Sequence, residues 1–220
     1  MARLKTAVLI SGRGSNLQAL IDACAEASFP AEIVAVISNR PGVGGLGRAA
    51  AAGIPAIVVD HRAYASRADF ETALDTALHE SGAQIICSAG FMRILTADFV
   101  ERWRDRCLNI HPSLLPAFPG LDTHARALAV GVRFAGCTVH FVRAEVDAGP
   151  IIVQAAVPVL PGDDEAALAA RVLAEEHRIY PLALKMVAEG RVRVADGQVL
   201  IDGAAAPIGA LINPAPENTT

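Results

Sequence analysis

The chain has 220 residues, of which 53% are hydrophobic and only 5% aromatic, and its formal net charge is −4. A chain of this length buries about 70% of its unfolded surface, so a core of small aliphatic side chains is sufficient. The weak negative charge excludes a general attraction to nucleic acid or to an anionic membrane. Because no window approaches 18 uncharged apolar residues, we also expect no membrane-spanning helix.

The four cysteines, Cys24, Cys87, Cys107 and Cys137, are widely spaced and form no C-x-x-C pair. This spacing matches no zinc or redox motif, so we expect no bound metal. Isolated cysteines at apolar positions are typical of reduced core residues. The first residues lead straight into a strand pattern instead of a signal peptide. These observations predict a cytoplasmic protein.

Strand and helix patterns alternate through the first half of the chain. Short continuous apolar runs predict buried strands at residues 6–10, 33–37, 56–59 and 84–89. Helices are predicted after the first strand, before Gly53, over about 68–81 and over about 97–104. This alternation predicts an α/β fold with a doubly wound, mostly parallel, Rossmann-like sheet. Ligands bind such sheets beyond the carboxyl ends of the strands, so the loops that start there should share one cleft.

A glycine turn, Ser11-Gly-Arg-Gly-Ser-Asn16, separates the first strand from its helix. Backbone N–H groups at the start of such a helix can face an anion. Ser15 or Asn16 could also cap the helix. The turn is not a Walker A loop and does not complete the dinucleotide-binding glycine pattern. A βα turn without any ligand is therefore the alternative to a phosphate site.

The stretch from Cys107 to Gly120 begins as a strand, in which Asn109 and His111 alternate with apolar residues, and continues as a loop with three prolines. Residues two apart on a strand point to one face, and Pro112 favours extended geometry at His111. We therefore expect an amide and an imidazole to project together from the end of a strand. The alternative is an ordinary proline-rich connection with a structural Asn and His.

After Gly120 the pattern changes. It predicts a helix at about 122–130, two antiparallel strands at 133–142 and 151–157, a long helix that starts near Glu165, and a hairpin at 192–201 around an Asp-Gly turn. Pro181 should kink or end the long helix. Residues 203–220 are rich in small residues and proline, which predicts a loose tail.

Several other polar residues have plain structural interpretations. His140 lies within a predicted strand, which favours a structural role over one in orienting water or substrate, whereas Met92 suits a core and a cleft equally. We interpret His61, His79 and His124 as surface or capping residues, and Asp122, Asp163 and Asp164 as helix caps. From its position on a charged helix alone, Glu176 is interpreted as a solvated residue.

Four motifs together resemble the glycinamide ribonucleotide formyltransferases, a folate-dependent family. They are residues 11–16, 89–95, 109–116 and 147–150, and the likeness extends from residue 5 to about 200. Arg13 occupies a variable position, and the tail after Gly203 has no counterpart. The resemblance implies transfer of the formyl group of 10-formyltetrahydrofolate to the amine of glycinamide ribonucleotide, in de novo purine (IMP) biosynthesis. It implies no metal, nucleic-acid or membrane partner, and it leaves a homodimer open.

The resemblance also implies roles for individual residues. Asn109, His111 and Asp147 match the family's catalytic trio. The ribonucleotide-binding positions match Gly14, Ser15, Asn16 and Glu176, and the folate-binding positions match Arg67, Met92, Arg93, Ile94, Leu95 and Asn109. One formyltransferase domain would cover residues 1–202, with a phosphate-binding half at about 1–105 and a folate-binding and catalytic half at about 106–202.

The chemistry of the trio agrees with this reaction. Attack of an amine on a formyl group places negative charge on oxygen, which hydrogen-bond donors must stabilise. The Asn109 amide and a protonated His111 can supply those donors, and the imidazolium can protonate the leaving folate nitrogen. Asp147 is the nearby carboxylate that would favour the protonated imidazole.

Three alternatives share parts of this pattern. Formyltetrahydrofolate hydrolase has the Asn-x-His core, but predicts an N-terminal regulatory domain and a different segment after the histidine. Methionyl-tRNA formyltransferase shares Ser-Leu-Leu-Pro, but predicts an RNA-binding domain and a basic surface. A non-catalytic folate- or nucleotide-binding module predicts loss of the trio, and all three residues are present. We therefore expect the transferase.

Overall fold

The computed structural model describes residues 2–205 and 209–214. Its strands are β1 (Leu4–Ile10), β2 (Ala31–Ser38), β3 (Ala56–Val58), β4 (Ile85–Ser88), β5 (Cys107–His111), β6 (Phe134–Phe141), β7 (Ile151–Pro158), β8 (Val192–Ala195) and β9 (Gln198–Ile201). Its helices are α1 (Ser15–Ala25), α2 (Gly44–Ala51), α3 (Arg67–Glu80), α4 (Ala97–Arg102), α5 (Thr123–Val130) and α6 (Glu165–Ala188), with a 3-10 turn at His61–Ala63.

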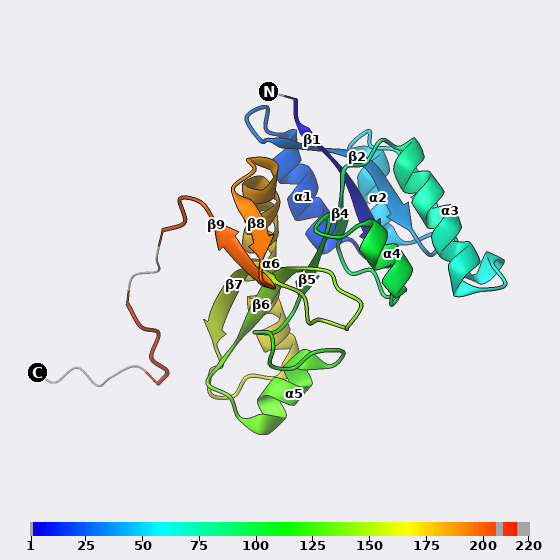
Figure 1. The fold of residues 1–220 in the computed structure, drawn as a ribbon. Helices are drawn as coiled ribbons and strands as arrows, with labels where there is room; N and C mark the ends of the chain where they lie inside the picture. Colours follow the sequence, from blue (N-terminus) through cyan, green and yellow to red (C-terminus); the bar gives the residue numbers. More distant parts are fainter. Residues whose placement is uncertain (1, 206–208, 215–220) are drawn as a thin grey trace, which may run out of the picture.

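The central sheet has helices on both faces. In β1, Val8 and Ile10 pack in the core beneath α1 and α6, whereas Ala7 and Leu9 pack in a second core beneath α3 and α4. Figure 1 shows α1 and α6 on the side of the sheet opposite α3 and α4. Burial of alternate residues in two different cores explains why this strand is apolar throughout. The predicted doubly wound α/β fold is confirmed.

The strand order is β3-β2-β1-β4-β5-β6-β7. β1 pairs in parallel with β2 and with β4, β4 pairs in parallel with β5, and the β5–β6 and β6–β7 pairs are antiparallel. The predicted parallel sheet with an antiparallel C-terminal portion is therefore confirmed. The chain changes its winding direction between β1 and β4, so the loops that follow these two strands border a crevice.

The antiparallel part of the sheet has a helix on only one face. Leu108, Ile110 and Val139 point into the core that α6 covers. The residues between them point to the opposite face, where Asn109 lies beside His140 in the strand register. Alternation of apolar and polar residues is typical of a strand with one face against a helix. The polar face of β5 and β6 is thus available for a site.

Pro181 does not end the long helix, which continues to Ala188. A proline inside a helix costs about 3 kcal/mol, because it removes a hydrogen bond and crowds the preceding turn. Tyr180 and Leu184 flank it and are completely buried. Burial of each such side chain contributes about 1.5–3 kcal/mol, which offsets the proline. Tertiary packing therefore overrides the local signal.

The remaining local predictions have mixed outcomes. Asp164 caps α6, since its Oδ1 accepts a hydrogen bond from Ala167 N at 2.8 Å. Asp163 instead pairs with Arg171, whose hydrogen bonds lower the pKa of Asp163 to about 2. Asp122 precedes α5 but makes no capping hydrogen bond with its side chain. The 192–201 hairpin is confirmed, with positive φ at Asp196 and Gly197 as in a type I′ turn.

The predicted tail lies partly outside the described residues, at 206–208 and 215–220. Within its described part, the Asn213 side chain donates hydrogen bonds to the carbonyls of Arg133 and Val159, at 2.6 and 3.0 Å. This part of the tail therefore contacts the body of the fold.

Helix α2 approaches the loop after β1 so closely that one of its glycines has no room for a side chain. A Cβ atom on Gly45 would lie 2.5 Å from Ile10 Cδ1 and 3.2 Å from the Gly12 carbonyl oxygen. Gly45 N donates a hydrogen bond to that same carbonyl at 3.1 Å. Gly47, in the same helix, has no atom within 4 Å of the corresponding position.

Alanine at these two positions should therefore have opposite effects on stability. Gly45→Ala should lower the free energy of unfolding by about 1–3 kcal/mol, through overpacking. Gly47→Ala should raise it by about 0.5–1 kcal/mol, because alanine is the better helix former. Thermal unfolding measures both effects, at about 2–4 °C per kcal/mol for a chain of this size. Shifts in the same direction for both variants would contradict the close approach of α2.

Candidate active site

The structure brings Asn109, His111 and Asp147 together on the polar face of β5 and β6. His111 Nδ1 lies 3.3 Å from Asp147 Oδ2, and both side chains are largely buried. Asn109 joins them through His140, whose Nε2 is 3.2 Å from Asn109 Nδ2 and 3.8 Å from Asp147 Oδ1. The predicted proximity of the carboxylate to the imidazole is therefore present.

Both ring nitrogens of His111 face acceptors. Nδ1 faces the Asp147 carboxylate, and Nε2 lies 3.0 Å from the carbonyl oxygen of Phe118. An imidazolium donates from both nitrogens, whereas a neutral imidazole donates from only one. Each ring nitrogen of His111 therefore has an acceptor to which it can donate when it carries a proton. A substrate oxygen that replaced the Phe118 carbonyl would accept a hydrogen bond from Nε2.

The loop that carries Asp147 is fixed by close backbone contacts. Asp147 has φ of 55°, a left-handed conformation that aspartate tolerates better than most residues. Its Oδ2 also accepts a hydrogen bond from Gly120 N at 2.8 Å. Gly149 lies against β6 so tightly that a Cβ atom there would be 1.7 Å from the Phe141 carbonyl oxygen. The loop is thus held across the polar face, with its carboxylate toward His111.

His140 holds the Asn109 side chain in place. Its Nδ1 lies 2.9 Å from the carbonyl oxygen of Phe141 and must donate to it, so Nε2 of the neutral ring is an acceptor. Burial lowers the pKa of His140, which keeps the ring neutral. Nε2 therefore accepts from the Asn109 amide and orients it. This contact with another side chain fits the predicted structural role of His140, and only the strand register reveals its partner.

The loop after β5 is held by side chains of β6 and β7 as well as by its prolines. Thr138 Oγ1 donates to the carbonyl of Ser113 at 2.7 Å and accepts from Leu115 N at 3.1 Å. Gln154 Nε2 donates to the Leu115 carbonyl at 2.8 Å. No feature of the sequence identified Thr138 and Gln154 as supports of this loop.

The glycine turn leads into a helix whose N-terminus has no side-chain cap. Gly14 occupies the N-cap position with φ of 75°, and α1 starts at Ser15. The expectation that Ser15 or Asn16 caps the helix is wrong. Among the residues that the structure describes, no side chain caps the first N–H groups of α1, which leaves them available to an anion.

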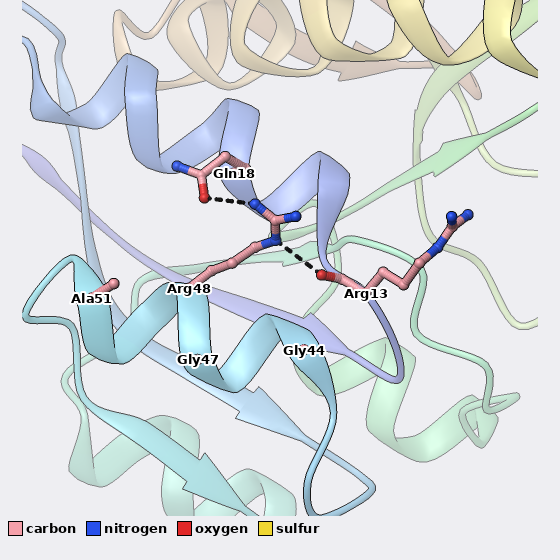
Figure 2. A pocket seen from close by; sticks show the side chains of 6 residues that line it. All are labelled: Arg13, Gln18, Gly44, Gly47, Arg48 and Ala51. Atoms are coloured by element: carbon pink, nitrogen blue, oxygen red, sulfur yellow. Dashed lines mark hydrogen bonds between the residues drawn. The ribbon is translucent and has the colours of Figure 1, made fainter.

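The carbonyl groups of the glycine turn are held by α2. Figure 2 shows Arg48 reaching from α2 to the carbonyl oxygen of Arg13, with Nε at 3.0 Å, and to Gln18, with Nη1 at 3.1 Å. The Arg13 guanidinium extends away from Arg48 (Figure 2). An open hollow of about 520 Å³ lies here, lined by Arg13, Gln18, Gly44, Gly47, Arg48 and Ala51. No residue of the trio lines it.

Glu176 is buried, so its interpretation as a solvated residue is wrong. Its Oε2 accepts a hydrogen bond from Asn16 Nδ2 at 2.6 Å, which links α6 to the start of α1. Burial raises the pKa of Glu176, and the Asn16 hydrogen bond opposes this shift. Asn16 Oδ1 is also buried and has no hydrogen-bond partner among the described residues. Two acceptors are therefore close together beside the glycine turn.

The loop after β4 exposes two large apolar side chains. Met92 is 64% exposed and Ile94 is 59% exposed, whereas Arg93 and Leu95 are only partly exposed. The interpretation of Met92 as a core residue is therefore wrong. Arg67 is the exposed first residue of α3, and no hydrogen bond joins its side chain to this loop in the described structure.

Two features are absent from the described part of the chain. No three His, Cys, Asp or Glu side chains there are grouped to hold a metal ion. None of the helices described there combines the length and apolar character needed to cross a membrane. All four cysteines are buried and unbridged.

The family model "Formyl transferase" matches residues 4–184. The chain is 45% identical over 200 residues to the phosphoribosylglycinamide formyltransferase of Escherichia coli, an alignment that covers 91% of this chain and 94% of the other. It is also 53% identical over 194 residues to the trifunctional purine biosynthetic protein adenosine-3 of Gallus gallus, which covers 88% of this chain. The aligned part is only 19% of that longer protein.

Solved structures agree with these relationships. The glycinamide ribonucleotide transformylase 1 of Symbiobacterium toebii superposes with a TM-score of 0.88 at 51% identity, covering 90% of this chain and 94% of the other. A formyltetrahydrofolate deformylase from Burkholderia mallei superposes with a TM-score of 0.82 at 29% identity, covering 91% of this chain and 70% of the other. The chain therefore belongs to the formyl transferase family, and within it to the phosphoribosylglycinamide formyltransferases.

Proposed function

We propose that the chain transfers the formyl group of 10-formyltetrahydrofolate to the amine of glycinamide ribonucleotide. The products are formylglycinamide ribonucleotide and tetrahydrofolate, a step of de novo purine biosynthesis. The observation that carries this proposal is the position of His111, between the Asp147 carboxylate and an acceptor, on the same face as the Asn109 amide.

In the proposed mechanism the substrate amine attacks the formyl carbon, and the carbonyl oxygen gains negative charge. The Asn109 amide and the His111 imidazolium donate hydrogen bonds to this oxygen in place of the Phe118 carbonyl. A proton passes from the attacking amine to solvent, and His111 supplies a proton to the folate N10. The bond between the formyl carbon and N10 then breaks, and the formyl group stays on the amine. Asp147 stabilises the imidazolium until His111 gives up this proton.

We propose that Gly14, Ser15 and Asn16 bind the phosphate of the ribonucleotide. The uncapped N-terminus of α1 supports this assignment, because its N–H groups and helix dipole favour an anion. Asn16 Oδ1 and Glu176 are acceptors beside this turn, which suits the hydroxyl groups of a ribose. Because the net charge of the protein is negative, it does not attract a phosphate, and the N–H groups of the turn provide the attraction locally.

We propose that Met92, Arg93, Ile94, Leu95, Arg67 and Asn109 bind the folate. The exposure of Met92 and Ile94 supports a binding role for the loop, since large apolar side chains gain by contacting a flat aromatic ligand. Val146 and Leu121 are also exposed, and they flank the residues that hold Asp147. Exposed apolar side chains are therefore present both on the loop after β4 and beside Asp147.

We further propose one formyltransferase domain over residues 1–202, divided near residue 105 into the two predicted halves. The continuous sheet, which runs from β3 to β7, supports a single unit. The four unbridged cysteines support a cytoplasmic location. A homodimer stays a prediction.

An assay with and without the acceptor tests the proposed reaction. Tetrahydrofolate should form from 10-formyltetrahydrofolate only when glycinamide ribonucleotide is present. Equal release of formate without the ribonucleotide would instead favour a hydrolase, the activity named for the similar deformylase structure. Asn109→Ala and His111→Ala should each lower the rate by at least about 100-fold, because each removes a donor to the developing oxyanion.

His79→Ala is a suitable control for these variants, since His79 is exposed on α3 and contacts Asp75. It should keep the wild-type rate. Circular dichroism and thermal unfolding should show that Asn109→Ala and His111→Ala remain folded. Near-normal turnover by either folded variant would contradict the assigned role.

Glu176→Gln should weaken ribonucleotide binding and stabilise the fold. Loss of the charged acceptor should raise KM for the ribonucleotide by about tenfold, as expected for a hydrogen bond to a charged group. Glu175→Gln is the matched control, because Glu175 is adjacent on α6 and pairs with Arg178 at 2.9 Å. It should leave this KM unchanged. An unchanged KM in Glu176→Gln would remove Glu176 from the ribonucleotide site.

The stabilising effect should depend on pH. Because burial raises the pKa of Glu176 in the folded chain, ionised Glu176 costs stability at neutral and alkaline pH. As the pH falls toward the ordinary value of 4.5, both states become protonated and the cost disappears. Glu176→Gln should therefore raise Tm at pH 8 by a few degrees and have little effect near pH 4.5, as thermal unfolding across this range would show.

A further inference from the structure

The two loops proposed to bind the two substrates are joined by a buried serine at the point where the sheet changes its winding direction. Ser11 directly follows β1 and precedes the glycine turn. Its Oγ accepts a hydrogen bond from Met92 N, in the loop after β4, at 2.8 Å. β1 and β4 are parallel neighbours, so this bond crosses the mouth of the crevice between their two loops.

The serine hydroxyl is itself held by the end of a third strand. Ser11 Oγ donates to Asn39 Oδ1 at 2.6 Å, and Asn39 directly follows β2. Both side chains are buried, with exposed fractions of 6% for Ser11 and 1% for Asn39. Because the hydroxyl proton points to Asn39, an oxygen lone pair is left for the Met92 N–H. The backbone carbonyl oxygen of Asn39 is 2.8 Å from His61 Nδ1, which must donate to it.

We propose that Ser11 is a positioning residue that sets the folate-binding loop through the main chain of Met92, although Ser11 belongs to the ribonucleotide-binding turn. This inference rests on the proposed function of the two loops. The Met92 side chain is largely exposed, so little packing of its own holds this part of the loop. The neighbouring side chains of Phe91 and Leu95 pack against the core, and the hydrogen bond to Ser11 fixes the main chain between them, from which the exposed side chain of Met92 projects.

The far end of the same loop has a separate anchor. Glu71, which is buried on α3, accepts a hydrogen bond from Thr96 N at 2.7 Å. Thr96 is the N-cap of α4. The loop is thus held near its middle by Ser11 and at its far end by Glu71, and of these two anchors Ser11 is the one next to the ribonucleotide-binding turn. A change at Ser11 should therefore affect folate more than the phosphate.

Ser11→Ala tests this proposal, with binding of tetrahydrofolate measured by calorimetry and KM measured for both substrates. Without the Ser11 hydroxyl, the Met92 N–H loses its acceptor, which destabilises the loop conformation that binds folate. Kd for tetrahydrofolate and KM for 10-formyltetrahydrofolate should therefore rise about 5- to 20-fold. KM for the ribonucleotide should change less than about twofold, because alanine keeps the backbone of the turn. Asn39→Ala should give a smaller effect of the same kind, and the double variant should be no weaker than Ser11→Ala, since both act through one hydroxyl.

Ser38→Ala is the matched control, because Ser38 is completely buried at the end of β2 but its Oγ donates to the Arg40 carbonyl, at 2.6 Å. It should leave folate binding unchanged. Unchanged tetrahydrofolate affinity in folded Ser11→Ala would overturn the proposal, as would equal losses for both substrates. Failure of the wild-type protein to bind tetrahydrofolate at all would instead overturn the proposed function.

Discussion

The antiparallel pairing of β5 with β6 is the constraint on which the candidate site depends. It places Asn109 opposite His140 and His111 opposite Thr138, and residues that face each other in this way project from the same side of a sheet. The helices α5 and α6 cover the other side, and the loop that carries Asp147 crosses this one. The loop with Asp147 can cross it because Gly149 has no side chain. A strand slipped by one residue would turn Asn109 and His111 into the core.

Charge burial at the site opposes stability. Burial of the Asp147 carboxylate beside His111 removes water from both polar groups, and their contact only partly replaces the lost hydration. The hydrogen bonds from Gly120 N to Asp147 and from His111 to Phe118 reduce this cost, because they satisfy the remaining polar atoms. Glu176 has a weaker partner set, and burial raises its pKa accordingly. Polar groups whose burial costs stability are typical of sites under functional constraint.

The sequence was sufficient for features that depend on local patterns. Apolar runs identified the strands of the main sheet, and the Asp-Gly pair identified the hairpin at residues 192–201. Each of these signals depends only on residues that are adjacent in the sequence. Features that depend on distant neighbours were missed. Burial of Tyr180 and Leu184 keeps the helix intact around Pro181. Glu176 is buried where it contacts Asn16, which lies 160 residues earlier in the chain. The contact of His140 with Asn109 follows only from the register between β5 and β6.

The strand order also relates the two ends of the proposed acceptor. The turn proposed to bind the ribonucleotide follows β1, the loop proposed to bind folate follows β4, and the trio begins on β5, so the three regions lie on successive strands. Neighbouring strands are about 4.8 Å apart, so β1 and β5 are separated by about 10 Å across the sheet. A ribose with a phosphate at one end and a glycinamide at the other can span such a gap, and the folate-binding loop lies between. This order lets a phosphate fixed at β1 direct an amine toward a formyl group held above β4 and β5.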